Sequence, residues 1–132
     1  MNAETRDAWQ RARTTIETAA SLAAHDPDSA VSRAYYAAFY AVSALFLLDG
    51  HTFVRHATVE NAVHRDLVKK GRWDVELGAA FSALLLLRGV GDYGGMRHAT
   101  LTDARGAVEK ARRILVAVAR ETGWQLDETG TV

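Results

Sequence analysis

SRAYYAAFYAVSALFLL, residues 32–48, is the stretch that decides the fold of this chain. No glycine or proline interrupts it, and small and bulky side chains alternate at helical spacing until Gly50 supplies a stop. Its apolar residues extend almost all the way around the predicted helix, which is typical of a helix that is covered on several sides. The stretch therefore predicts the central helix of an all-α bundle.

Helical periodicity predicts further helices around this one, over residues 4–24, 58–70, 73–88 and 102–121. Asp26 and Pro27 fit the start of the central helix, where an acceptor side chain and a missing N–H are both favourable. Gly71 and Gly123 fit the ends of two other helices.

We expect residues 51–57 to form a loop or a short irregular helix, and the glycine-rich segment 89–95 to break the fourth helix. Short connections between helices favour antiparallel neighbours. The expected fold is an antiparallel up-and-down bundle of four long helices and one short helix over residues 1–123. A loose tail is expected over residues 124–132.

Composition limits the function. A chain of 132 residues suits one domain, and its 16 basic and 16 acidic side chains cancel, so net charge indicates no bulk attraction to nucleic acid or membranes. The absence of cysteine fits a reducing compartment. The first residues, MNAETR, lack the apolar core of a secretory signal, and the longest uninterrupted apolar runs are far short of a membrane span. We expect a cytoplasmic protein with no membrane partner.

Polar side chains gather at two places in the predicted bundle. Arg33, Tyr36 and Tyr40 lie at i, i+3 and i+7, so a cation and two phenols project from one face of the central helix. They form either a hydrogen-bonded element of a helix interface or a ligand site. Arg88 ends a leucine-rich helix and precedes Asp92. Arg88 either pairs with Asp92 to pin a turn or presents its planar fork to a phosphate, with Tyr93 alongside.

Two other functions lack the context they need. Gly89, Gly91 and Gly94 match the dinucleotide fingerprint, but that site requires a preceding strand, and here a helix precedes it. The five histidines show no HExxH spacing. We therefore expect no metal and no cofactor. His64 is interpreted as a hydrogen-bonded structural residue or as a proton carrier in a groove.

Several stretches together resemble a HEPN-domain protein of the small stand-alone bacterial and archaeal kind. These stretches are residues 32–40 (SRAYYAAFY), His51-Thr52, residues 67–71 (LVKKG), and Leu87-Arg88 through Gly91-Asp92-Tyr93. The resemblance covers nearly the whole chain and implies a bundle of four or five helices that commonly dimerises. It also implies one of two roles. Many members are encoded beside a minimal nucleotidyltransferase, as toxin and antitoxin, and many others are metal-independent ribonucleases.

The ribonuclease branch places a histidine a few residues after an arginine that matches Arg88. Here the residue five positions on is Tyr93, and His98 lies too far along the chain to fit. General acid–base work at neutral pH requires a group that titrates there, which an ordinary tyrosine does not. Arg88 and Tyr93 are the candidate catalytic residues, and whether the chain is an enzyme stays open.

These observations favour a HEPN module that binds a nucleotide or RNA phosphate within a toxin–antitoxin-like system containing a nucleotidyltransferase. The candidate binding residues are Arg33, Tyr36, Tyr40, Arg88, Asp92 and Tyr93. The alternatives are a ribonuclease in which Tyr93 or His98 replaces the missing histidine, and a purely structural helical protein. We expect a homodimer through the helices at 32–48 and 73–88, because both are apolar around much of their circumference.

Overall fold

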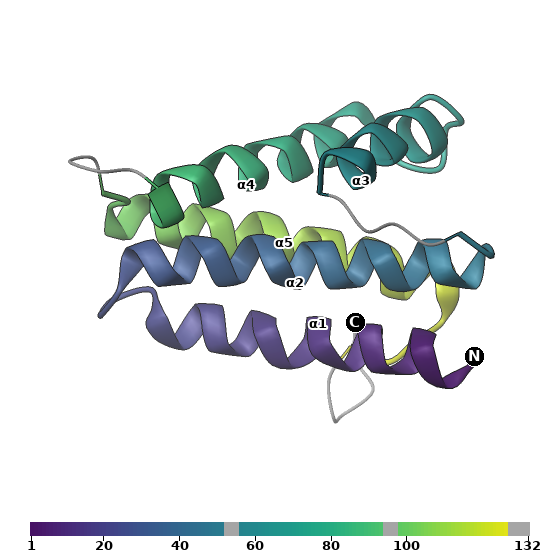
Figure 1. Cartoon of the computed structure of the whole chain (residues 1–132), viewed down its shortest axis with the longest axis horizontal. Coiled ribbons are helices and arrows are strands. Elements are labelled where there is room, and N and C mark those ends of the chain that lie inside the picture. The colour runs from purple at the N-terminus through teal and green to yellow at the C-terminus, as the bar shows by residue number, and fades with distance from the viewer. Residues whose placement is uncertain (52–55, 94–97, 127–132) are drawn as a thin grey trace.

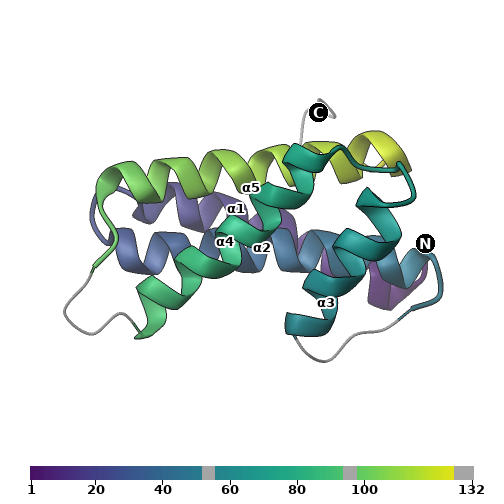
Figure 2. The ribbon, with the colours of Figure 1, turned by 90° about the horizontal axis from the view of Figure 1, so that it is seen from above.

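The computed structural model describes residues 1–51, 56–93 and 98–126, and every regular element in these ranges is helical (Figure 1). The elements are α1 (Ala3–Leu22), α2 (Pro27–Leu48), α3 (His56–Ala62), the π-helical segment η1 (Val63–Val68), α4 (Val75–Tyr93) and α5 (Leu101–Thr122). The prediction of an all-α bundle with four long helices and one short helix is confirmed, with α3 and η1 together forming the short one. Figure 2 shows that α4 crosses α2 and α5 obliquely.

α2 is the central helix that the sequence predicts. Helices α1, α4 and α5 all pack against it, and buried residues occupy most of its circumference. By length and composition alone, α2 is long and apolar enough to cross a membrane. The length of uninterrupted apolar runs does not reveal this, because polar residues interrupt the helix. Most of this apolar segment is buried in the bundle, so packing within the protein accounts for its composition.

Side-chain caps begin the first two helices. Asn2 Oδ1 accepts the Thr5 N–H at 2.8 Å, and Asp26 Oδ1 accepts the Ser29 N–H at 3.2 Å, with Pro27 in the first turn of α2. The predicted start of α2 is therefore confirmed. Such caps satisfy backbone N–H groups that have no partner within the helix.

The short third helix changes its period halfway. In η1 the Lys69 N–H donates to the His64 carbonyl oxygen at 3.0 Å, five residues back rather than four. Gly71 follows with a φ of 80°, the left-handed conformation that the sequence predicts there. His64 Nε2 lies 2.8 Å from Ser82 Oγ of α4, which favours the structural interpretation of this histidine.

The predicted break of the fourth helix at residue 89 is wrong. α4 continues through Gly89 and Gly91 and ends at Tyr93, while residues 94–97 lie outside the described residues. Gly91 packs against the first turn of α2, where a Cβ atom would lie 2.5 Å from the Asp28 carbonyl oxygen and 2.7 Å from Val31 Cγ2. This glycine therefore serves the close approach of two helices rather than a turn.

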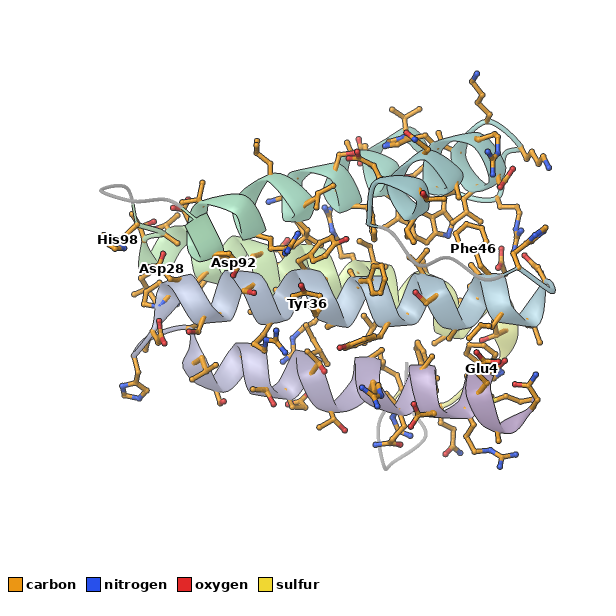
Figure 3. The ribbon with its side chains drawn as sticks, in the orientation of Figure 1. Glu4, Asp28, Tyr36, Phe46, Asp92 and His98 are labelled. Carbon is orange, nitrogen blue, oxygen red and sulfur yellow. The ribbon has the colours of Figure 1, made fainter. Side chains whose placement is uncertain are left out.

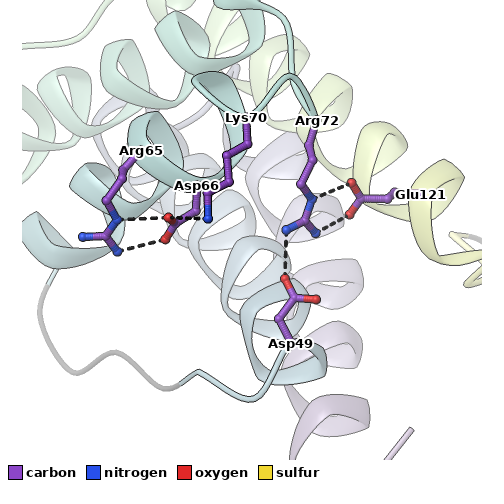
Figure 4. Close-up of polar contacts among 6 residues, drawn as sticks. All are labelled: Asp49, Arg65, Asp66, Lys70, Arg72 and Glu121. Atoms are coloured by element: carbon purple, nitrogen blue, oxygen red, sulfur yellow. Dashed lines mark hydrogen bonds and ion pairs between the residues drawn. The ribbon is translucent and has the colours of Figure 1, made fainter.

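At the opposite end of α2, Arg72 joins three parts of the chain (Figure 4). Its Nη1 donates to Asp49 at 2.9 Å, and its Nε and Nη2 donate to the two carboxylate oxygens of Glu121 at 3.2 and 2.9 Å. Hydrogen bonding to Glu121, and then to Asp49, raises the pKa of Arg72, so the guanidinium stays charged. We call these three residues the Arg72 clamp.

The C-terminal part of the described chain returns to α1. Gly123 ends α5 with a φ of 80°, as predicted. The indole N–H of Trp9 then donates to the Gln125 carbonyl oxygen at 2.8 Å, and the rings of Trp9 and Trp124 lie 5.4 Å apart. Residues 124–126, within the stretch expected to be loose, thus contact α1. Residues 127–132 lie outside the described residues, and for them the expected loose tail stays a prediction.

Candidate functional site

One face of α2 carries a continuous row of aromatic and basic side chains. Arg33 Cζ lies 4.7 Å from the centre of the Tyr36 ring, and the Tyr36 and Tyr40 ring centres are 6.2 Å apart. All three side chains are half-buried. The helical spacing of these residues therefore brings them together on one face, as the sequence predicts.

Arg88 of α4 reaches the same row from the other side. Its Cζ lies 5.4 Å from the centre of the Tyr36 ring and 5.6 Å from that of Tyr35. Its Nε donates to Asp92 Oδ2 at 3.1 Å, one turn further along α4. The predicted Arg88–Asp92 pair exists, but it lies within a helix and not in a turn. We call Arg33, Tyr36 and Arg88 the arginine–tyrosine cluster.

A hollow of about 360 Å³ adjoins the cluster at the start of α2. Its lining comes from α1, α2 and α4: Leu22, Asp28, Ser29, Ser32, Arg33, Gly91 and Asp92. Figure 3 shows Asp28 near the start of α2, Tyr36 further along the helix, and Asp92 between them in this view. Because Gly91 lets the end of α4 approach α2 closely, it brings Asp92 into this lining.

Asp28 holds His98 at the edge of the hollow. Its Oδ1 accepts the Ala99 N–H and its Oδ2 lies against His98 Nδ1, both at 2.7 Å. Hydrogen bonds from Ala99 and His98 lower the pKa of the Asp28 carboxyl. No local pattern predicts this contact, because 70 residues separate Asp28 from His98.

The two arginines of the cluster differ in their acidic partners. Arg88 pairs with Asp92, whereas within the described residues no carboxylate oxygen lies within 4.0 Å of the Arg33 guanidinium.

Tyr35 lies beneath Arg88 and is fully buried. Burial raises the pKa of Tyr35 and outweighs the nearby Arg88 charge, so this phenol stays protonated at neutral pH.

A third arginine lies beside the far end of the row. Arg11 Cζ of α1 is 6.0 Å from the centre of the Tyr40 ring, and Arg11 Nε donates to Asp7 at 3.0 Å. Bonding to Asp7, with a smaller contribution from Tyr40, raises the pKa of Arg11. Arg11 thus links α1 to the aromatic face of α2.

A protein-family model for the HEPN domain matches residues 5–121 of this chain. The chain belongs to the HEPN family. It is 37% identical to a UPF0332 protein of Thermotoga maritima over 112 residues, which cover 83% of this chain and 85% of that protein. It is 30% identical to a UPF0332 protein of Gloeobacter violaceus over 117 residues, which cover 87% and 93%. The family inferred from the motifs is thus confirmed.

The structure places the candidate catalytic residues of this HEPN chain differently. Arg88 is in the cluster, but the side chain of Tyr93 lies outside the described residues, so its catalytic and binding roles stay predictions. His98 is too far along the chain for the family spacing, yet its contact with Asp28 brings it to the edge of the hollow. A carboxylate that orients an imidazole is a common arrangement in acid–base catalysis.

The described residues also bear on two motifs from the sequence. Gly89 and Gly91 lie inside α4, and the described residues before them contain no strand, so they lack the context of a dinucleotide site. Among the side chains that the structure describes, no group of three His, Cys, Asp or Glu residues is placed to hold a metal ion.

Proposed function

We propose that this HEPN protein binds the phosphate of a nucleotide or of RNA at the arginine–tyrosine cluster. The observation that carries the proposal is the placement of two guanidinium groups on one phenol ring, with Arg33 and Arg88 4.7 and 5.4 Å from the centre of Tyr36. Planar guanidinium groups donate bidentate hydrogen bonds to phosphate, and charge-assisted bonds of this kind are among the strongest in proteins.

Arg33 is the better anchor for a phosphate. Within the described residues it has no carboxylate partner, whereas a phosphate at Arg88 would compete with Asp92. Tyr36 and Tyr40 extend the site with aromatic rings, which are the usual partners of bases in single-stranded nucleic acid. The row thus combines the cation and the aromatic surface that such a ligand needs.

The test measures binding of a fluorescently labelled single-stranded RNA and of ATP to the purified protein. Losing one charge-assisted hydrogen bond costs about 1.5–3 kcal/mol, so Arg33→Ala should weaken binding about tenfold or more. Arg113→Ala is the matched control, because Arg113 is an exposed arginine of α5. Equal weakening by both substitutions would mean nonspecific charge attraction and would contradict the proposal.

We also propose that the protein forms a homodimer through α4. The apolar surface of α2, expected to serve the dimer, is mostly consumed inside the subunit. On α4, however, Val75 and Leu86 are each 75% exposed, with exposed Ala79 between them. Sedimentation at micromolar concentration should give a dimer, and Leu86→Glu should give a folded monomer. A monomeric wild-type protein would contradict the proposal.

The biological partner that we propose is a minimal nucleotidyltransferase, in a toxin–antitoxin-like pair located in the cytoplasm. The support is family membership and, for the compartment, the absence of cysteine. A nucleotidyltransferase encoded in the neighbouring reading frame should co-purify with this protein when the two are expressed together. Separate elution of the two proteins would count against the pairing.

A second candidate function is metal-independent cleavage of RNA, and the Asp28–His98 contact is the observation that favours it. The carboxylate orients the imidazole at the edge of a hollow that also includes Arg33. In this mechanism His98 is the general base and an arginine stabilises the charge that develops on phosphate. RNA cleavage in the presence of a chelator should then disappear in His98→Gln and persist in His25→Gln, since His25 is an exposed histidine with no role in the hollow. Absence of cleavage by the wild-type protein would leave the binding function alone.

A further inference from the structure

Ser32 is the unusual member of the hollow's lining. It is 7% exposed, and its Oγ forms no hydrogen bond within the described part of the chain. The neighbouring Ser29 differs, because its Oγ donates to Asp26 Oδ2 at 2.6 Å. Among the described side chains, the polar atoms that are both fully buried and without a partner are Ser43 Oγ and Trp73 Nε1. Ser32 Oγ is not one of them, so it keeps contact with solvent at the hollow and can bond a group that enters there.

The hollow offers Ser32 a complementary set of neighbours. Asp92 uses Oδ2 to accept from Arg88, and within the described residues Oδ1 accepts no hydrogen bond. Arg33 contributes donors, while Leu22 and Gly91 contribute apolar surface. A ligand hydroxyl in the hollow could donate a hydrogen bond to Asp92 and accept one from Ser32 or Arg33.

The charge of the lining selects against a second phosphate. Asp28 and Asp92 place two carboxylates around the hollow and Arg33 only one cation. A neutral group rich in hydroxyls avoids this repulsion and satisfies the same donors and acceptors. In a nucleotide, the unit next to the phosphate is the sugar, and the hollow adjoins the cluster through Arg33, which belongs to both.

We propose that the hollow is a ribose subsite, in which Ser32 and Asp92 bond the hydroxyl groups of the sugar whose phosphate lies on Arg33. The inference rests on the proposed phosphate-binding function and adds a preference for ribose over deoxyribose. The ligand chemistry is a ribose phosphate, supplied either by a free ribonucleotide or by an RNA chain. The 2′-hydroxyl is the group by which a protein distinguishes RNA from DNA.

The experiment compares a labelled single-stranded RNA with DNA of the same sequence, and AMP with dAMP, on the wild-type protein and two variants. Ser32→Ala removes the hydroxyl without adding atoms. Ser43→Ala is the control, because Ser43 is another serine of α2 whose Oγ has no partner in the described residues, and it does not line the hollow. Circular dichroism verifies that both variants remain helical.

The wild-type protein should bind the ribose form about fivefold or more tightly than the deoxyribose form, as expected for one hydrogen bond. Ser32→Ala should reduce this ratio to about one by weakening only the ribose form, and Ser43→Ala should leave it unchanged. A preference seen for AMP alone identifies a free ribonucleotide as the ligand, and one seen with the oligonucleotides identifies RNA.

Three results would overturn the ribose subsite. Equal binding of ribose and deoxyribose forms by the wild-type protein, with the dependence on Arg33 intact, refutes the subsite while the phosphate site stands. A ribose preference that survives in Ser32→Ala assigns the discrimination to other residues. Absence of any Arg33-dependent binding refutes both the subsite and the proposed function.

Discussion

The two ends of the bundle carry similar charges in different arrangements. In the Arg72 clamp, one guanidinium is held by carboxylates from two other parts of the chain, and the neighbouring Arg65 and Lys70 both pair with Asp66. In the arginine–tyrosine cluster, Arg33 instead rests on a phenol ring, with no acidic partner among the described residues. When carboxylates accept the N–H groups of a guanidinium, the arginine stabilises the fold. When the guanidinium instead lies over an aromatic ring, its N–H groups can still bind a ligand.

The largest effect is expected from Gly91→Ala, which tests how closely the helices must approach at the cluster end. The new methyl group would lie 2.5 Å from the Asp28 carbonyl oxygen, so backbone must move. We expect a loss of about 1–3 kcal/mol in the free energy of unfolding, measured by urea denaturation, together with weaker RNA binding.

Gly89→Ala is the control for this substitution. Gly89 lies in the same helix, and a Cβ atom there would meet nothing within 4 Å. Removing a helical glycine should therefore stabilise the protein by about 0.5–1 kcal/mol. Equal stability of the two variants would show that the close contact between α4 and α2 does not contribute to the free energy of unfolding.

The next effect is expected from Arg72→Ala, which tests the comparison between the two ends directly. The Arg72 side chain is 32% exposed and makes bidentate bonds to Glu121, so we expect a loss of about 1–2 kcal/mol in unfolding free energy. RNA binding should not change, because the clamp lies at the opposite end of α2. Arg33→Ala should behave in the reverse way, with a stability change below about 0.5 kcal/mol. If both substitutions changed stability alike, the distinction between the ends would fail.

The smallest effect is expected from Asp28→Asn, which tests the charge at the edge of the hollow. Asp28 lies in the first turn of α2, where a carboxylate stabilises the helix by about 0.3–1 kcal/mol. Its pKa in the folded protein is lowered from 3.8, chiefly by the Ala99 N–H, so this stabilisation is complete above about pH 4 and is lost as pH falls through the lowered value.

Urea titrations between pH 2.5 and 7 measure this dependence. The wild-type protein should be more stable than Asp28→Asn at neutral pH. The difference should shrink as pH falls below about 4 and should vanish once the pH is below the lowered pKa of Asp28, where both proteins carry a neutral side chain. A difference that stays constant over this range would assign the effect to geometry instead of charge.

The fold was largely predictable because its signals are local. Helical spacing around residues 32–48, the acceptor at Asp26 and the glycines at Gly71 and Gly123 each act within a few residues. The end of α4 was mispredicted because Gly91 serves a contact with α2, and local sequence cannot distinguish a glycine that packs from a glycine that turns. The period change in η1 likewise has no local signature in this chain.

The candidate site was predictable only in part. The spacing of Arg33 and Tyr36 places them together on one helix, and Arg88 was selected as a charge that needs a partner. The hollow depends on residues distant in sequence: Asp28 contacts His98, and Ser32 and Asp92 line the hollow from different helices. No periodicity or motif reports such contacts, so these residues emerge only from the packed helices.

The contact of Trp9 with Gln125 has a consequence for the order in which the chain folds on the ribosome. The two residues are 116 positions apart, so α1 and α2 leave the ribosome and pair long before residues 124–126 exist. Until then, water satisfies the Trp9 indole N–H, and the side of α1 that Trp124 later covers is open to solvent. The contacts of residues 124–126 with α1 thus form late in the folding of this bundle, and until they form Trp9 lacks its aromatic neighbour Trp124.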